Sequence, residues 1–223
     1  VHPDYLCGVN PMTITLEPNA KMTTQPHTLY VFDFDGTLTT NDTLIEFIRY
    51  ANGTWSLVGS LCRMLPKLLM MKLHLRDNGL TKEELFARHF KGMTIEAFDE
   101  VCQRFAAHHQ ALLRPKGVAT LRRAMEQGAR VLVVSASVDN WVAPFFPGVD
   151  VQGTQAEVTD GRLTGRFLTR NCYGQEKVNR LKQAVPELRN NRQQYYIVAF
   201  GDSRGDKEML EFADERHYKP FRK

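Results

Sequence analysis

Short apolar runs recur at three places in the chain, and polar residues directly follow each of them. The runs lie at 29–32, 130–135 and 195–200, and most of their side chains are β-branched, aromatic or leucine. A short apolar run with polar residues at its ends is typical of a strand that is covered on both faces, as in a parallel sheet. The pattern therefore predicts three buried strands.

Between the first two runs, apolar residues recur every three or four positions, which is typical of amphipathic helices. Thr43-x-x-Glu46 and Thr81-x-x-Glu84 have the spacing of capping boxes, which begin helices. We expect Pro66 to divide the second helical stretch into a pair of helices. The predicted helices cover 43–51, 55–73, 81–92 and 95–113. Since no strand pattern occurs among them, we predict an inserted all-helical cap at 42–113.

After Pro115 the pattern changes to an alternation of helices and strands. The predicted elements are a helix at 116–127, the strand at 130–135, a short helix at 140–146, a hairpin of 151–158 and 162–168 that turns at Asp160-Gly161, a helix from 174 to about 186, and the strand at 195–200. This alternation favours a parallel sheet with helices on both faces. We predict an α/β fold with a Rossmann-like three-layer core made of 28–41 and 114–223, and a loosely ordered N-terminal arm at 1–27.

Composition narrows the class of protein further. A chain of 223 residues with 43% hydrophobic and 24% charged residues can form one substantial globular domain with a small insert. The net charge of +4 mildly favours anionic partners, but the basic residues are scattered, so we predict no nucleic-acid binding. Arg122-Arg123 and the tail residues Lys219, Arg222 and Lys223 are expected to be solvated.

The cysteines and the N-terminal sequence bear on the compartment. Cys7, Cys62, Cys102 and Cys172 are far apart and form no Cys-x-x-Cys pair, which argues against a disulfide framework and against structural zinc. The first 27 residues hold no apolar segment of signal-peptide length. We therefore expect a cytoplasmic protein.

Polar residues that suit phosphate and metal chemistry follow the predicted strands or begin a helix. They are Asp33, Asp35, Gly36, Ser135, Ala136, Lys177, Asp202 and Asp206. In a parallel sheet such positions meet at the carboxyl edge. Carboxylates bind hard cations such as Mg²⁺, while an ammonium group and a hydroxyl bind phosphoryl oxygens. Taken singly, each residue has an ordinary structural explanation, such as an acidic turn, a surface lysine or a helix cap.

The order of these motifs resembles a known superfamily. Asp33-Phe34-Asp35-Gly36-Thr37 resembles the first signature of the haloacid dehalogenase superfamily of aspartyl-phosphate phosphatases. Ser135, Lys177 and the segment 201–206 match the other three signatures in order. The helical insert after the first motif resembles the phosphoserine-phosphatase-like branch. The resemblance implies a phosphatase with an α/β core and a helical cap.

The resemblance also implies a role for each matching residue. Asp33 would be the nucleophile that forms an aspartyl-phosphate, and Asp35 the general acid and base. Mg²⁺ would be held by Asp33, the main-chain carbonyl of Asp35, Asp202 and Asp206. The phosphoryl group would be bound by Gly36, Ser135, Ala136 and Lys177.

The substrate is less sharply defined by the sequence. Asp42 and Arg88 are the candidates for substrate specificity, and a small phosphorylated metabolite such as a phosphoserine-like ester is the first expectation. Ala136 and Ser137 stand where phosphoserine phosphatases usually carry two glycines, and Gly205 stands where they usually carry asparagine.

Two alternatives remain open at this stage. The stretch 55–73 is rich in Leu and Met and carries Arg63, Lys67 and Lys72. It is interpreted first as helices packed in a bundle with basic side chains at the rim, and otherwise as a surface that contacts a membrane. In the second case the substrate would be a phospholipid phosphate resembling phosphatidylglycerophosphate. A further hypothesis is a non-catalytic module that binds a phosphorylated ligand.

Overall fold

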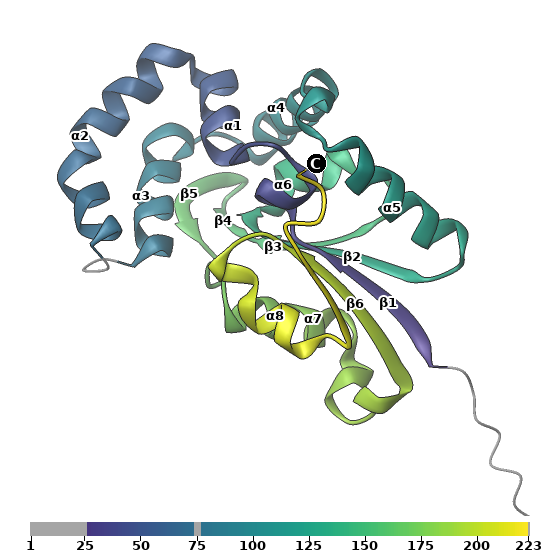
Figure 1. The fold of residues 1–223 in the computed structure, drawn as a ribbon. Coiled ribbons are helices and arrows are strands. Elements are labelled where there is room, and N and C mark those ends of the chain that lie inside the picture. The colour runs from purple at the N-terminus through teal and green to yellow at the C-terminus, as the bar shows by residue number, and fades with distance from the viewer. Residues whose placement is uncertain (1–25, 74–76, 223) are drawn as a thin grey trace, which may run out of the picture.

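A five-stranded sheet runs through the middle of the protein (Figure 1). The computed structural model describes residues 26–73 and 77–222, so the arm predicted at 1–27 lies almost wholly outside the described residues. The strands of the sheet, in spatial order, are β3 (Asp150–Thr154), β2 (Arg130–Val138), β1 (His27–Phe32), β6 (Tyr195–Gly201) and β7 (Glu215–Tyr218). Every neighbouring pair is parallel, and the three predicted strands occupy its centre.

The two faces of the sheet bury alternate residues of these strands. On one face, Phe32, Val133 and Phe200 belong to the same apolar core as Leu121 of α5 (Pro115–Glu126). The other face includes Val31, Leu132 and Ala199, and it is covered by α7 (Gln175–Ala184) and α8 (Lys207–Phe212). Successive side chains of a strand point to opposite faces of the sheet, so neighbouring residues such as Val31 and Phe32 fall in different cores. The predicted three-layer α/β core is confirmed.

Four helices lie beyond the carboxyl edge of the sheet (Figure 1). They are α1 (Thr43–Asn52), α2 (Thr54–Lys72), α3 (Asn78–Phe90) and α4 (Ile95–His108). Their interior is aromatic: the ring of Phe47 lies against those of Phe90, Phe98 and Phe105, and stacks on Trp141 of the core at 4.8 Å between centroids. The helices predicted between 43 and 113 are therefore present, with differences in detail.

Those differences concern where the helices begin and end. α2 is one continuous helix through Pro66, so the predicted pair is wrong. α1 is capped by Asp42, whose side chain accepts from Leu44 N, and α3 by Asp77, whose side chain accepts from Leu80 N. The proposed capping boxes are wrong because the Thr43 hydroxyl donates elsewhere and Thr81 lies inside its helix. α4 ends at His108 and is followed by a 3₁₀ turn at Gln110–Leu112.

A β-hairpin joins the core to the cap helices. Its strands are β4 (Ala156–Thr159) and β5 (Arg162–Phe167), and the predicted turn at Asp160-Gly161 has positive φ at both residues. The first half of the predicted 151–158 strand is instead β3 of the main sheet. Gly92 N donates to Leu163 O at 2.8 Å, and Leu163 N donates to Met93 O at 2.9 Å. The hairpin is therefore bonded to the link between α3 and α4.

The remaining elements are short. The helix predicted near 140–146 consists of α6 (Asp139–Val142) and a 3₁₀ turn at Ala143–Phe145. Within the described part of the chain, no helix combines the length and the apolar character that crossing a bilayer requires.

Candidate active site

Asp33 follows β1 directly and is buried at the carboxyl edge of the sheet. Its main-chain N–H donates to Phe200 O at 2.9 Å, which continues the pairing of β1 with β6. The side-chain Oδ1 accepts from Lys177 Nζ at 2.5 Å. Oδ2 is buried and has no hydrogen-bond partner among the described residues. One carboxylate oxygen is thus held by a cation while the other is available to a ligand.

Lys177 lies in the first turn of α7 and is only 2% exposed. Its ammonium group donates to Asp33 Oδ1, to Val134 O at 2.9 Å and to Asp206 Oδ1 at 2.6 Å. Burial alone would lower the pKa of Lys177, but Asp33 and Asp206 outweigh it and raise the pKa above its ordinary value. Burial raises the pKa of Asp33 to about 7, although Lys177 acts in the opposite direction.

Asp35 lies in the irregular turn Phe34–Leu38 that follows β1. Its Oδ1 accepts from the main-chain N–H and the hydroxyl of Thr43, both at 2.7 Å. Its Oδ2 accepts from the Ser137 hydroxyl at 2.6 Å. The carboxylate is therefore fixed between the end of β1, the start of α1 and the end of β2.

Gly36 allows the turn to approach the loop after β6. Its φ is 81°, and a Cβ at this position would lie 2.6 Å from Asp202 Oδ2. Only glycine adopts such a φ without strain and leaves that space open. Asp202 also accepts from the Thr37 hydroxyl at 3.4 Å and from the guanidinium of Arg222. Arg222 is 44% exposed, as expected of a solvated tail residue, and it also pairs with Asp202.

Carboxylate oxygens of Asp33, Asp202 and Asp206 lie within 4.8 Å of one another. Asp206 is already satisfied, since its Oδ1 binds Lys177 and its Oδ2 accepts from Asp202 N, Ser203 N and the Ser203 hydroxyl. Against the effect of burial, Lys177 keeps the pKa of Asp206 below its ordinary value. Both oxygens of Asp202 also have partners, but these are the side chains of Thr37 and Arg222, whereas Asp206 is bound by the buried Lys177 and by the main chain of its own loop. Asp33 and Asp202 are therefore better placed to offer oxygens to a cation, and Asp206 holds Lys177 and the loop in place.

Ser135 is buried near the end of β2. Its hydroxyl accepts from Ser137 N at 3.0 Å and lies 3.4 Å from Asp35 Oδ2. Ala136 lies between the two serines, and its carbonyl accepts from the Thr154 hydroxyl at 3.1 Å. The end of β2 is thus brought beside Asp35, as its place in a parallel sheet predicts.

The two specificity candidates lie in different surroundings. Asp42 is exposed and caps α1 next to Thr43, the residue that binds Asp35. Arg88 lies on α3, where its guanidinium donates to Glu84 Oε1 at 3.0 Å instead of contacting the carboxylates of the site. The structure therefore places Asp42 beside the candidate active site and directs Arg88 into an ion pair on the cap.

Thr43, Ser137 and Arg222 were not among the residues proposed from the sequence. Ser137 could have been found from its position two residues after Ser135. The other two offer no such signal, because Thr43 has the pattern of an ordinary helix start and Arg222 belongs to a polar tail.

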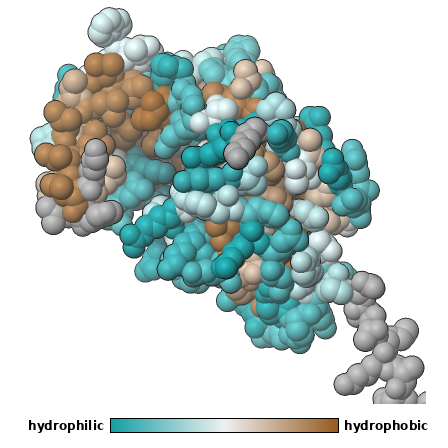
Figure 2. All heavy atoms as spheres, viewed as in Figure 1, coloured by the Kyte–Doolittle hydropathy of each residue, from teal (hydrophilic) through white to brown (hydrophobic). Residues whose placement is uncertain are grey.

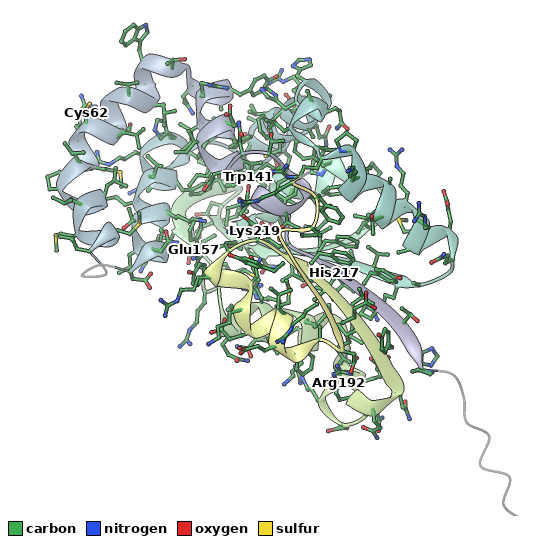
Figure 3. All side chains as sticks on the ribbon, in the orientation of Figure 1. Cys62, Trp141, Glu157, Arg192, His217 and Lys219 are labelled. Atoms are coloured by element: carbon green, nitrogen blue, oxygen red, sulfur yellow. The ribbon has the colours of Figure 1, made fainter. Side chains whose placement is uncertain are left out.

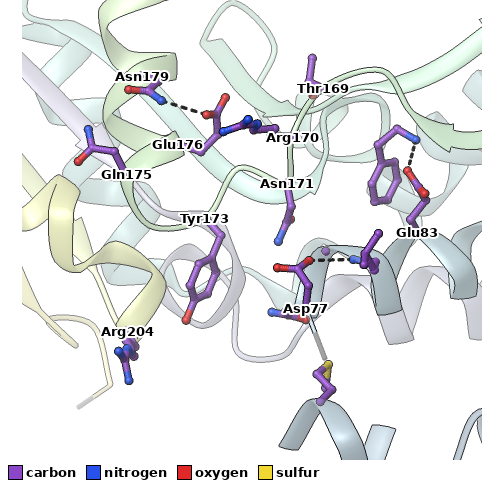
Figure 4. Close-up of a pocket in the computed structure, with 15 residues that line it drawn as sticks. Asp77, Glu83, Thr169, Arg170, Asn171, Tyr173, Gln175, Glu176, Asn179 and Arg204 are labelled. Carbon is purple, nitrogen blue, oxygen red and sulfur yellow. Dashed lines mark hydrogen bonds between the residues drawn. The ribbon is translucent and has the colours of Figure 1, made fainter. Parts of the chain in front are cut away.

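A cleft of about 1200 Å³ lies between the start of α3 and the loop before α7. Figure 4 shows Asp77 and Glu83 on the cap side of this cleft, and Tyr173 and Arg204 on the core side. None of the carboxylates of the candidate active site lines it. Tyr173 packs closely on Gly205, so the cleft borders the loop that carries Asp202 and Asp206.

The fold and the carboxylate site together define a hydrolase with a parallel-sheet core and a helical cap. Residues 30–211 match the family described as haloacid dehalogenase-like hydrolase. The chain is 36% identical over 201 residues to Protein CicA of Caulobacter vibrioides (strain NA1000 / CB15N), a match that covers 87% of this chain and 86% of that protein. The chain belongs to the haloacid dehalogenase-like hydrolases.

Solved structures extend the likeness of the fold. A protein of unknown function from Bordetella pertussis Tohama I matches with a TM-score of 0.72 and 20% identity, over 86% of this chain and 89% of that one. A phosphoserine phosphatase in its apo form matches with a TM-score of 0.59 and 21% identity, over 86% of each chain. The resemblance to the superfamily is confirmed, and the fold is that of the phosphoserine-phosphatase-like members.

Proposed function

We propose that the protein is a Mg²⁺-dependent phosphomonoester hydrolase that forms an aspartyl-phosphate on Asp33. The observation that carries this proposal is the state of the Asp33 carboxylate. One oxygen is bound to the buried Lys177 and the other is buried without a partner among the described residues. A carboxylate with one free oxygen, beside an ammonium group, suits attack on a phosphorus atom.

In the first step, Asp33 Oδ2 forms a bond to phosphorus while the bond from phosphorus to the ester oxygen breaks. The leaving alcohol takes a proton, which Asp35 is positioned to supply because three donors fix its carboxyl group. Water then attacks the phosphorus of the aspartyl-phosphate and Asp35 accepts its proton, which releases phosphate and restores Asp33. Lys177 and Ser135 would stabilise negative charge on the phosphoryl oxygens.

The residues present fit a magnesium ion. The donors are carboxylate oxygens of three residues that lie within 4.8 Å of one another, and Gly36 leaves open the space that a side chain would fill. Asp33 and Asp202 would hold the ion together with the main-chain carbonyl of Asp35. When bound, it would offset the repulsion between the carboxylate and the phosphoryl group.

The proposed substrate is a small phosphorylated metabolite, and phosphoserine-like esters are supported by the fold shared with phosphoserine phosphatases. A phospholipid phosphate is the second candidate, because α2 presents an exposed apolar surface. A purely binding role is disfavoured, since binding alone does not need both Asp33 and Asp35. A cytoplasmic location is part of the proposal, and it is supported by the free thiols of the three described cysteines.

The test is a panel of soluble and lipid phosphomonoesters, assayed with Mg²⁺ or with EDTA. We expect Asp33→Asn to abolish phosphate release and the acid-stable phosphoenzyme, while Asp150→Asn, on an exposed edge of β3, keeps both. Phosphate release by Asp33→Asn at the wild-type rate would overturn the mechanism. Hydrolysis of lipid phosphates alone would select the second substrate class.

A further inference from the structure

The helix α2 is apolar on two sides. Leu57 and Met64 lie on the inner side and are buried against the other cap helices. Trp55, Leu65 and Leu69 lie on the outer side and are 87%, 65% and 58% exposed. Figure 3 shows Cys62, which shares this outer side, pointing away from α3. A helix of a soluble protein usually has a polar outer side, so this apolar surface calls for a partner.

The exposed apolar residues form one continuous stripe, which we term the α2 apolar face. It consists of Trp55, Val58, Leu65, Leu69, Met70 and Leu73, at least 41% exposed each. The spacing of three or four residues places most of them on one side of the helix. In Figure 2 this face is the large hydrophobic area over the cap, whereas most of the rest of the visible surface is hydrophilic. Patches of this kind mark interaction sites.

The charge of α2 indicates the chemistry of that partner. The helix carries Arg63, Lys67 and Lys72 and no acidic residue. Arg63 is exposed, and Lys67 remains 41% exposed while its ammonium group bonds to Glu84. An apolar stripe flanked by basic groups complements a bilayer with anionic head groups, where the stripe enters the acyl region and the cations meet phosphates. A purely apolar protein partner would not account for this one-sided charge.

We propose that the α2 apolar face docks on the surface of a membrane that contains anionic phospholipids. The helix lies in the plane of the interface, because its inner side is packed against the cap and only the outer side chains can enter the bilayer. Met71 and Leu80 are among the residues that line the cleft of about 1200 Å³, so the cleft adjoins the C-terminal end of α2. The proposal concerns binding and is independent of the catalytic mechanism.

The fluorescence of Trp55 can be used to detect this contact. It has two tryptophans, of which Trp55 lies on the α2 apolar face and Trp141 is 1% exposed in the core. We expect vesicles made of equal parts phosphatidylcholine and phosphatidylglycerol to shift the tryptophan fluorescence of the full chain to shorter wavelength. The same vesicles should reduce the quenching of this fluorescence by iodide. Pure phosphatidylcholine should do so more weakly. Trp55→Phe should remove the change, since Trp141 is already buried.

A pair of matched variants tests the face itself. Leu65→Ser with Leu69→Ser should reduce the partition onto anionic vesicles by roughly tenfold or more, since two apolar side chains leave the buried contact. Met125→Ser with Leu168→Ser removes two exposed apolar side chains elsewhere and should leave partition unchanged. Both variants should hydrolyse a soluble ester as the wild type does.

Two results would overturn the proposal. In the first, iodide quenches the fluorescence of Trp55 equally well with and without either kind of vesicle. In the second, Trp55 is protected without vesicles, which would mean that a second copy or another segment of the chain covers the face. Light scattering coupled to gel filtration would distinguish these two sources of protection.

Discussion

Lys177 places a positive charge at the centre of three acceptors in a region that excludes water. The carboxylates of Asp33 and Asp206 depend on it, because each would otherwise be a buried anion without a cation. The sequence located these three residues, since each lies just after an apolar strand or at the start of a helix. It could not separate the role of Asp206 from that of Asp202, because only the folded loop shows that Asp206 is bound by Lys177 and by the main chain of residues 202 and 203.

Replacing Lys177 should therefore affect stability as well as activity. Lys177→Met leaves two buried carboxylates without their cation, which is expected to lower the free energy of unfolding by about 3–5 kcal/mol. Lys207→Met is the control, because Lys207 is 64% exposed and forms a surface pair with Glu211, worth less than about 1 kcal/mol. Chemical denaturation measures both, and equal stability of the two variants would contradict this account of the buried cluster.

The raised pKa of Asp33 links magnesium binding to pH. With a pKa of about 7, the metal-free carboxyl group is largely protonated in mildly acidic solution, and a cation must displace that proton. The affinity for Mg²⁺ should thus rise as pH increases through about 7 and then level off. Titration calorimetry in buffers of different ionisation enthalpy should detect the released proton below pH 7. Asp33→Asn cannot release it, and a proton release that persisted in this variant would assign it to another group.

Asp139 offers a pH effect on stability away from the metal ligands. Burial raises its pKa from 3.8 to about 6 in the folded protein. Because the pKa of Asp139 is higher in the folded than in the unfolded protein, its protonated form contributes fully to stability below the unfolded pKa of 3.8. This contribution is lost as pH rises through the folded pKa of about 6. Asp139→Asn should thus be more stable than the wild type at pH 8, by up to about 3 kcal/mol. The difference should vanish near pH 4, and a difference that is constant with pH would contradict the assignment.

Strands that consist of an apolar run can be predicted from the sequence. Strands and helices whose bounds are set by pairing or packing with other elements cannot. β1, β2 and β6 are continuous apolar segments, and their parallel pairing follows from the helices between them. β7, a polar edge strand of four residues, gives no such signal. The sequence predicts a single strand at 151–158, because only the pairing of β3 with β2 separates β3 from β4. The continuity of α2 gives no signal in the sequence, because Pro66 usually ends or kinks a helix and only the packing of α2 allows it to continue.

The turn after β1 can be tested through Gly36. Gly36→Ala should strain a φ of 81° and push its Cβ against Asp202, which would lower magnesium affinity by about tenfold or more. Gly148→Ala is matched, since Gly148 has the same φ of 81° and nothing within 4 Å of its Cβ position. It should show the backbone strain of about 1 kcal/mol without the loss of metal binding. Equal metal affinities in the two variants would rule out the close approach as the cause.

At the scale of the whole molecule, Asp35 joins the cap to the core. Thr43 begins the cap and binds Asp35, while the Trp141 indole N–H donates to the Thr43 hydroxyl at 3.2 Å. This convergence could not be read from the sequence, because Thr43 and Trp141 are 98 residues apart. The general arrangement of a helical insert over a parallel sheet could be predicted, since it depends on patterns that extend over whole segments.

Thr43 therefore positions the proposed acid and base. Thr43→Val removes the hydroxyl donor to Asp35 and should lower kcat by about tenfold or more. Thr43→Ser keeps the hydroxyl and should restore the rate. A Thr43→Ser variant as slow as Thr43→Val would mean that the hydroxyl does not position Asp35.

The bonds between the hairpin and the link from α3 to α4 restrict how the protein can move. Because Leu163 exchanges two hydrogen bonds with Gly92 and Met93, any rotation of the cap relative to the sheet carries β4 and β5 with it. The two connections at the base of the cap are themselves paired, with Thr40 N bonded to Leu112 O at 2.9 Å. Bending is then left to a few peptide units at that base and at either end of the hairpin, so these units are where substrate entry would be controlled.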